Sequence, residues 1–340
     1  MSADREPFGS TRDGRPVEKI TLRRDATEAE IITDGAALRA LRVPDKNGGT
    51  VDVVLGYDAP ALYEDNGGYV GAVVGRYANR IGGASCLIGD RRFDLVPNEG
   101  PNQLHGGPEG FDRQVFSVLD GGEDFVTLAY TSPDGQGGFP GKLELWVTYA
   151  LTGQGLSIRY EAVTDRTTHC NVTNHAYFNL NGSGDILLHR LWLAAHQFTP
   201  VGPDSIPLDM ARSVAGTPFD FTEEKPIGQD IGADDEQLYN VGGYDHNFVL
   251  DPGQGMRLAA RLTGDVSGIV MEVWTEKPGV QFYSGNVLSA KGGKGGDYTP
   301  RRGLCLETQF FPDSPNHPQW GDILLRPGRR YDYTTEYRFV

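Results

Sequence analysis

The chain has 340 residues, and its formal net charge at pH 7 is −15. This acidity argues against a nucleic-acid-binding protein and against docking on an anionic membrane, because no basic surface is available to neutralise phosphates. The chain contains 46 Gly and 21 Pro, and its glycine share is nearly twice the usual share of roughly 7%, which predicts frequent turns and little room for long helices.

Apolar residues that alternate with period two predict strands along most of the chain. We expect residues 1–15 to be loosely ordered. The strands expected further along cover residues 125–130, 142–149, 156–162, 186–194, 269–273 and 330–340. Residues 200–243 are rich in Pro, Gly and acids, which predicts long loops with one short helix near residues 234–240. The spacing of strands and turns suits antiparallel strands better than βαβ units.

The organisation predicted from the sequence is one domain over residues 1–340. A chain of this length usually suggests two domains, although large all-β sandwiches often exceed the usual size. We find no linker, repeat or low-complexity segment that would divide the chain. Periodicity by itself therefore predicts a large antiparallel β protein.

The cysteines and the N-terminus predict a cytoplasmic protein. Cys86, Cys170 and Cys305 are odd in number and show no C-x-x-C spacing, so we expect reduced, buried thiols. The first residues form no apolar signal segment, and no run reaches the roughly 18 apolar residues of a membrane span.

Two short motifs carry groups suited to proton transfer. His175 lies in Thr173–Leu180, and Glu307 lies in Leu306–Gln309. A histidine and a carboxylate on a rigid sheet can give a proton to one oxygen and take one from another. Taken alone, a histidine among aromatics is more often structural and a glutamate more often lies on the surface, so the residues leave both interpretations open.

Polar residues elsewhere in the chain offer the hydrogen-bond donors and acceptors that a sugar would need. They are Asn79, Arg80, Asn102, His105, Asn174, Asp245 and Gln281.

Six motifs, in order along the chain, carry a resemblance to a known family. They are Gly75-Arg76-Tyr77-Ala78-Asn79-Arg80-Ile81, Asn102-Gln103-Leu104-His105-Gly106-Gly107, Thr173–Leu180, Tyr244-Asp245-His246-Asn247, Gly279–Asn286 and Leu306-Glu307-Thr308-Gln309. The chain resembles the aldose 1-epimerases, also called galactose mutarotases. Any one motif is weak, whereas six in order over nearly the whole chain are highly specific.

The resemblance implies an all-β fold: a large twisted antiparallel β-sandwich of the galactose mutarotase type, with few short helices and the sugar in a cleft over a concave sheet. It implies an isomerase that interconverts the α and β anomers of aldohexoses such as glucose and galactose. By the same resemblance Glu307 is the base and His175 the acid of ring opening, without a metal or an organic cofactor.

The resemblance also implies substrate-binding residues. Arg80 with Asn79 presents a donor fork to sugar hydroxyls, His105 supports the ring-oxygen end or a neighbouring hydroxyl, and Asp245 and Gln281 bind further hydroxyls. Three aromatic residues are candidates for an apolar wall or for core packing: Tyr177, Phe282 and Phe310.

Three other functions remain open. A glycoside hydrolase would use Asp245 and Glu307 as paired carboxylates. A non-catalytic sugar-binding β-sandwich would not need Glu307 and His175. A hexose-6-phosphate 1-epimerase would need basic residues near the C6 end of the sugar, and the sequence locates none. The expected partner is a monosaccharide, with no nucleic acid and no membrane, and we expect a monomer or a homodimer.

Overall fold

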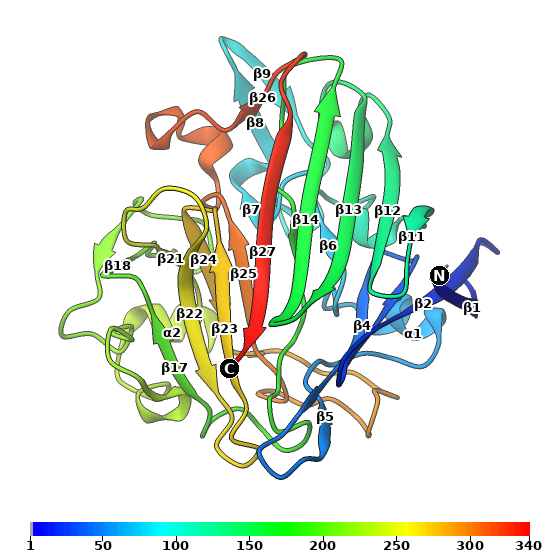
Figure 1. Cartoon of the computed structure of the whole chain (residues 1–340). Helices are drawn as coiled ribbons and strands as arrows, with labels where there is room; N and C mark the ends of the chain where they lie inside the picture. Colours follow the sequence, from blue (N-terminus) through cyan, green and yellow to red (C-terminus); the bar gives the residue numbers. More distant parts are fainter. Residues whose placement is uncertain (1–2) are drawn as a thin grey trace.

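The computed structural model describes residues 3–340, and its largest element is a nine-stranded antiparallel sheet (Figure 1). Period-two alternation is the reason for this sheet, because buried and partly exposed residues alternate along its central strands, as in β13 and β14. In sheet order the strands are β11 (Ser117–Gly121), β12 (Phe125–Ser132), β13 (Leu143–Thr152), β14 (Gly155–Thr164), β27 (Tyr331–Phe339), β23 (Val270–Thr275), β22 (Arg257–Thr263), β17 (Arg190–Leu193) and β20 (Lys225–Pro226).

Two five-stranded sheets form the layer behind it. One consists of β1 (Asp4–Ser10), β2 (Pro16–Arg24), β3 (Thr27–Ile32), β4 (Leu38–Pro44) and β5 (Thr50–Asp52). The other runs in the order β19 (Arg212–Ser213), β18 (Gln197–Phe198), β21 (Asp245–Val249), β24 (Gly279–Tyr283) and β25 (Cys305–Gln309).

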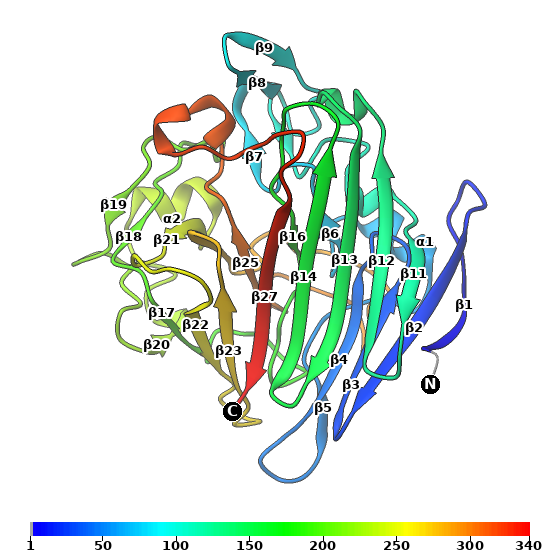
Figure 2. The same cartoon turned by 45° about the horizontal axis from the view of Figure 1, so that its top comes forward.

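The layers pack face to face over one large apolar cluster (Figures 1 and 2). The cluster joins residues from Ile20 on β2 to Tyr337 on β27. Polar bonds also cross between the layers: the Tyr149 hydroxyl donates to the Ala36 carbonyl at 2.7 Å, and the hydroxyls of Thr308 and Thr335 share a hydrogen bond. The predicted β-sandwich is therefore confirmed.

Short two-stranded ribbons form separately from these three sheets. They pair β7 (Arg80–Ile81) with β10 (Gln103–Leu104), β6 (Val73–Val74) with β16 (Thr173–Asn174), β8 (Ser85–Ile88) with β9 (Arg91–Asp94), and β15 (Thr168–His169) with β26 (Leu324–Leu325).

Helices are few and short, as predicted. The α-helices are α1 (Pro60–Asn66) and α2 (Glu236–Val241), and the 3₁₀ turns are Gly82–Ala84, Phe111–Arg113, Gln136–Gly138, Ile227–Gln229, Ser314–Asn316 and Pro318–Trp320. α2 confirms the helix expected near residues 234–240. It begins at Asp235, whose carboxylate accepts the Gln237 backbone N–H at 2.8 Å, and ends at Gly242 with φ of 69°. Within residues 3–340, no helix has the length and apolar character needed to cross a membrane.

The N-terminal segment differs from the prediction of loose order. Asp4–Ser10 forms β1 and pairs with β2, while Met1 and Ser2 lie outside the described residues. This strand is largely exposed, so it has no apolar period to reveal it. Its stability comes instead from backbone pairing and from cross-strand ion pairs such as Lys19 with Glu6, at 2.6 Å.

A second difference concerns the strand expected at 186–194. Only Arg190–Leu193 pairs, as β17, because Ile186 and His189 are held in a turn that precedes it.

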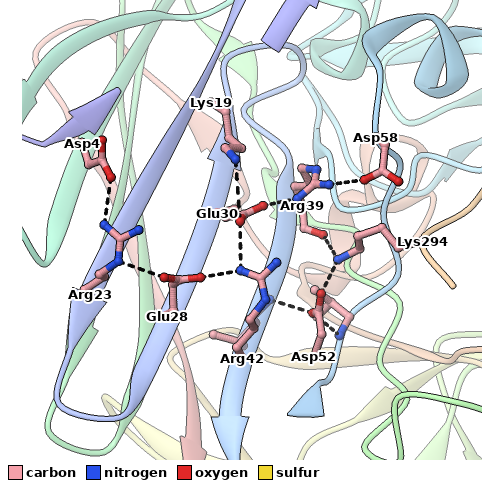
Figure 3. Close-up of polar contacts among 12 residues, drawn as sticks. Asp4, Lys19, Arg23, Glu28, Glu30, Arg39, Arg42, Asp52, Asp58 and Lys294 are labelled. Carbon is pink, nitrogen blue, oxygen red and sulfur yellow. Dashed lines mark hydrogen bonds and ion pairs between the residues drawn. The ribbon is translucent and has the colours of Figure 1, made fainter. Parts of the chain in front are cut away.

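A network of charged side chains covers the outer face of β2–β5 (Figure 3). Glu30 is 6% exposed and lies among three cations: Arg39, Arg42 at 2.9 Å and Lys19 at 3.8 Å. The network reaches the distant loop at Lys294, whose ammonium donates to the Arg39 carbonyl. One buried carboxylate therefore compensates several partly desolvated cations.

We predict that Glu30→Gln lowers the free energy of unfolding by about 3–5 kcal/mol, because it removes the buried counter-charge of Arg39 and leaves this buried guanidinium with the exposed Asp58. Urea denaturation measures this change. The matched control is Glu18→Gln, which breaks the exposed Arg5–Glu18 pair and should cost no more than about 1 kcal/mol. Equal losses in the two variants would contradict the central role of Glu30.

Candidate functional site

A cleft of about 440 Å³ lies over the sheet that contains β21, β24 and β25. Its walls come from the strand ends, from the loops around residues 68–69 and 99–105, and from the C-terminal end of α2 with the residue that follows it. The cleft collects, from distant parts of the chain, most of the site residues that the sequence predicts: Asn79, Arg80, His105, His175, Tyr177, Asp245 and Glu307.

Strand register places Glu307 in this cleft. In the antiparallel pairs, Glu307 lies opposite Gln281, and Gln281 lies opposite Asn247. Their neighbours Leu306 and Phe282 point the other way and belong to the apolar core. The pleat alone therefore sends a row of polar side chains toward the cleft side of a sheet whose other face is buried.

His175 directly follows β16, the short strand that pairs with β6. Its backbone is fixed on both sides, since its N–H donates to the Ala72 carbonyl at 2.8 Å and its carbonyl accepts the Gly71 N–H at 2.9 Å. Its Nε2 lies 3.6 Å from Glu307 Oε1, and its Nδ1 lies 3.4 Å from Cys305 Sγ. The histidine and the carboxylate that the sequence predicts as a pair are therefore neighbours.

Burial drives the pKa values of this pair in opposite directions. Desolvation, with a contribution from the charge of Asp245, raises the pKa of Glu307 well above its ordinary value, although Arg80 opposes the shift. Desolvation lowers the pKa of His175 to about 4. Oε2 of Glu307 is buried and has no hydrogen-bond partner among the described residues. Burial therefore favours the neutral form of each group, a carboxyl for Glu307 and an uncharged imidazole for His175.

His105 and Asn79 form a second unit at the edge of the cleft. Both residues have left-handed backbone conformations, with φ of 53° and 69°. The Asn79 backbone N–H donates to His105 Nδ1 at 3.0 Å. Burial, His175 and Arg80 hold the pKa of His105 well below its usual range. His105 is therefore neutral with its proton on Nε2, a fixed hydrogen-bond donor.

Arg80 lies between two carboxylates. Its Nε and one terminal nitrogen donate to Glu99 at 2.7 and 2.9 Å, while the other terminal nitrogen is 3.6 Å from Asp245 Oδ2. Burial disfavours its charge, yet Asp245 and Glu99 raise the pKa of Arg80 above its ordinary value. Burial also raises the pKa of Asp245, against the opposing effect of Arg80.

Gln281 lies behind Asp245, 3% exposed, and donates to Asp245 Oδ1 at 2.7 Å. It thereby orients the carboxylate, and its predicted contact with a substrate stays a prediction. The Asn79 amide similarly reaches Gln309 at 3.4 Å.

Some of the predicted polar and aromatic contacts lie elsewhere. Asn102 accepts the Gly83 N–H and Asn174 donates to the Gly71 carbonyl, so both amides hold the backbone. Phe282 lies in the core because period-two alternation directs it away from Gln281. Phe310 packs on Tyr333, with a ring-centroid distance of 5.4 Å.

The aromatic wall of the cleft consists of tyrosines instead. Tyr177, one of the three aromatic candidates, packs in a buried apolar cluster and also lines the cleft, where Tyr69 and Tyr283 join it. The Tyr69 ring lies 4.6 Å from the His105 ring and 5.7 Å from the His175 ring. Period-two alternation along β24 places Tyr283 on the same face as Gln281, and Tyr283 lies opposite Cys305 in the β24–β25 pair. For Tyr69 and Glu99, both in turns, the sequence holds no comparable signal.

Three of these groups also form a potential cation site. Ligand atoms of His105, His175 and Glu307 all lie within 4.8 Å of one another. Two imidazoles and a carboxylate are a ligand set that divalent ions accept. The three residues lie far apart along the chain, so the sequence shows no ligand spacing that would predict this cluster.

The fold and the site together define an enzyme that can move protons on a small hydroxylated molecule. A family model described as aldose 1-epimerase matches residues 18–338. The aldose 1-epimerase of Escherichia coli K12 is 42% identical over 335 residues, covering 96% of each chain, and the galactose mutarotase of mouse is 42% identical over 346 residues, covering 100% of this chain and 99% of the relative.

Solved structures agree with these matches. An aldose epimerase homologue from C. elegans has a TM-score of 0.89 at 31% identity, covering 95% of this chain and 98% of that one. A galactose 1-epimerase from Lactobacillus acidophilus has a TM-score of 0.87 at 28% identity, covering 100% and 99%. The chain belongs to the aldose 1-epimerase family and is an enzyme of the isomerase class.

The electrostatics predict how a charge change shifts the pH dependence. The negative charge of Asp245 raises the pKa of Glu307, so Asp245→Asn should lower it. The basic limb of kcat/KM reports loss of the proton that Glu307 and His175 share in the free enzyme, and it should therefore move to lower pH. A pH series of kcat/KM measures the limb even if the variant binds sugar weakly. The exposed Asp251, paired with His196, supplies the control Asp251→Asn, which should leave the limb in place. An unshifted limb in Asp245→Asn would contradict the coupling.

Proposed function

We propose that this chain equilibrates the α and β anomers of galactose and glucose, with Glu307 as base and His175 as acid. The observation that supports this most is the separation of 3.6 Å between His175 Nε2 and Glu307 Oε1 in a cleft lined by polar groups. Two groups this close can reach the two oxygens bonded to the anomeric carbon of one sugar.

Ring opening needs two proton transfers. Glu307 takes the proton of the anomeric hydroxyl, the C1–O1 bond becomes a carbonyl, and the bond from C1 to the ring oxygen breaks as His175 protonates that oxygen. After rotation about C1–C2 the reverse steps close the ring on the other face of the carbonyl. Each positioned acid or base typically contributes about 10²–10⁴-fold to such a reaction.

Burial favours the neutral one of two proton distributions in this pair. The neutral pair, carboxyl with imidazole, holds as many protons as the reactive pair, carboxylate with imidazolium. Substrate binding favours the reactive pair, because the anomeric hydroxyl donates a hydrogen bond to the carboxylate and the ring oxygen accepts one from the imidazolium. No proton has to be exchanged with the solvent.

The other residues bind the sugar. His105 presents its Nε2–H as a donor, and Asp245 presents Oδ2 as an acceptor while Gln281 holds Oδ1. Arg80, with Asn79 beside it, donates from the nitrogen that Glu99 leaves free. We also infer a reducing, cytoplasmic location, because all three cysteines are buried free thiols.

The decisive experiment follows anomer exchange in D₂O by proton NMR. Galactose and glucose should equilibrate without deuterium at C2, and methyl glycosides should stay inert because their anomeric oxygen carries no proton. Loss of the H2 signal at a rate near that of anomer exchange would show isomerisation through an enediol instead.

Glu307→Gln should lower kcat at least about 100-fold, since the amide keeps the shape of the side chain but cannot accept the anomeric proton. Circular dichroism establishes that the fold is retained. A variant with more than about a tenth of the wild-type kcat would remove Glu307 from the role of base.

Chelation tests the cation cluster. Both half-reactions are proton transfers, so dialysis against EDTA should leave kcat within about twofold of its starting value. A larger loss that Zn²⁺ or another divalent ion restores would assign His105, His175 and Glu307 to a metal.

A further inference from the structure

Glu99 occupies the edge of Arg80 that would otherwise recognise an anion. Guanidinium groups bind phosphates and carboxylates bidentately through two parallel N–H donors. In Arg80 the Nε and terminal nitrogen of one such edge are both bonded to Glu99, at 2.7 and 2.9 Å. The third nitrogen lies 3.6 Å from Asp245. Glu99 therefore fills one bidentate edge of this guanidinium, and the remaining nitrogen lies near a second carboxylate.

Arg80 is also the only permanently charged cation among the described residues that line the cleft. Three carboxyl groups line it as well, those of Glu99, Asp245 and Glu307. The two imidazoles do not restore the balance, because burial lowers the pKa of both. Carboxyl groups therefore outnumber permanently charged cations among the described residues of the cleft.

The position of Glu99 is fixed by its turn. Glu99 and Asn102 exchange backbone hydrogen bonds of 3.1 and 3.0 Å across Gly100, whose φ is 56°. The Glu99 side chain remains 38% exposed, on the wall of the cleft. A flexible surface glutamate would move aside for an anionic ligand, whereas this one is held by its backbone and by two charge-assisted bonds to a buried arginine.

We propose that Glu99 is a specificity-determining residue that excludes anionic aldoses, such as hexose 6-phosphates and hexuronates, and restricts the site to uncharged sugars. It acts in two ways: it fills the bidentate edge of Arg80, and it adds a negative charge to a partly desolvated cleft. This inference rests on the proposed anomer exchange and names the substrate class of the same site.

The test compares glucose with glucose 6-phosphate. Anomer exchange of both is measured by NMR with the rate without enzyme subtracted, and the quantity of interest is the ratio of kcat/KM for the phosphate to that for glucose. In the wild type this ratio should be well below one. Glu99→Gln keeps the shape of the side chain and removes its charge, so the ratio should rise roughly three- to tenfold, a range set by one charge interacting through a partly screened cleft.

Glu123→Gln is the control, because Glu123 is exposed in the turn between β11 and β12 and lies outside the cleft. It removes the same charge from the chain and should change the ratio less than twofold, since exposed distant charges are screened. An unchanged ratio in Glu99→Gln, an equal change in both variants, or a wild-type ratio near one would each overturn the proposal.

A salt series covers the case in which Glu99→Gln is inactive on both sugars. In the wild type the ratio must then rise as KCl is raised from about 20 to about 200 mM, because screening weakens the repulsion of the phosphate; a flat ratio would overturn the proposal. Failure of the wild type to equilibrate any neutral aldose would instead overturn the proposed function. The rate with glucose therefore tests the proposed function, and the ratio of kcat/KM for glucose 6-phosphate to that for glucose tests the role of Glu99.

Discussion

The register of three antiparallel strands is the constraint on which the whole site depends. Because Glu307 pairs with Gln281 and Gln281 with Asn247, one row of polar side chains faces the cleft while Leu306 and Phe282 complete the core. A slip of one residue in β25 would bury the carboxylate among apolar side chains and present a leucine to the substrate. The large apolar cluster that enforces this register therefore also positions the base.

The remaining site residues come from segments that are not regular strands, and backbone hydrogen bonds hold them. His175 is bonded on both sides to Gly71 and Ala72, and His105 is tied to Asn79 through its ring nitrogen. Left-handed conformations at Asn79 and His105 are unfavourable for such residues. Two hydrogen bonds hold these conformations, from the Asn79 N–H to His105 Nδ1 and from the His105 N–H to the Asn79 carbonyl.

The sequence predicts well what periodicity governs and poorly what charge or turn geometry governs. The central strands and the face that carries Cys305, Glu307 and Gln309 follow from period two, whereas the exposed β1 has no apolar pattern and forms through pairing and ion pairs. The family resemblance identifies His175 and Arg80 as site residues. No sequence pattern links Arg80 with Glu99, because the two residues meet only where β7 pairs with β10 and the turn before β10. Applying alternation to β24 would have selected Tyr283 instead of Phe282.

Burying Glu307 and His175 costs desolvation free energy, and this penalty affects how the two groups can transfer protons. Desolvation raises the pKa of Glu307 and lowers the pKa of His175 to about 4, so it disfavours the ionised form of each group. A sugar hydroxyl that donates to Glu307 and a ring oxygen that accepts from His175 offset this penalty, and they offset it most when the two groups are ionised. These two interactions therefore strengthen as the ring opens, which is the condition for lowering a barrier rather than only binding a ligand.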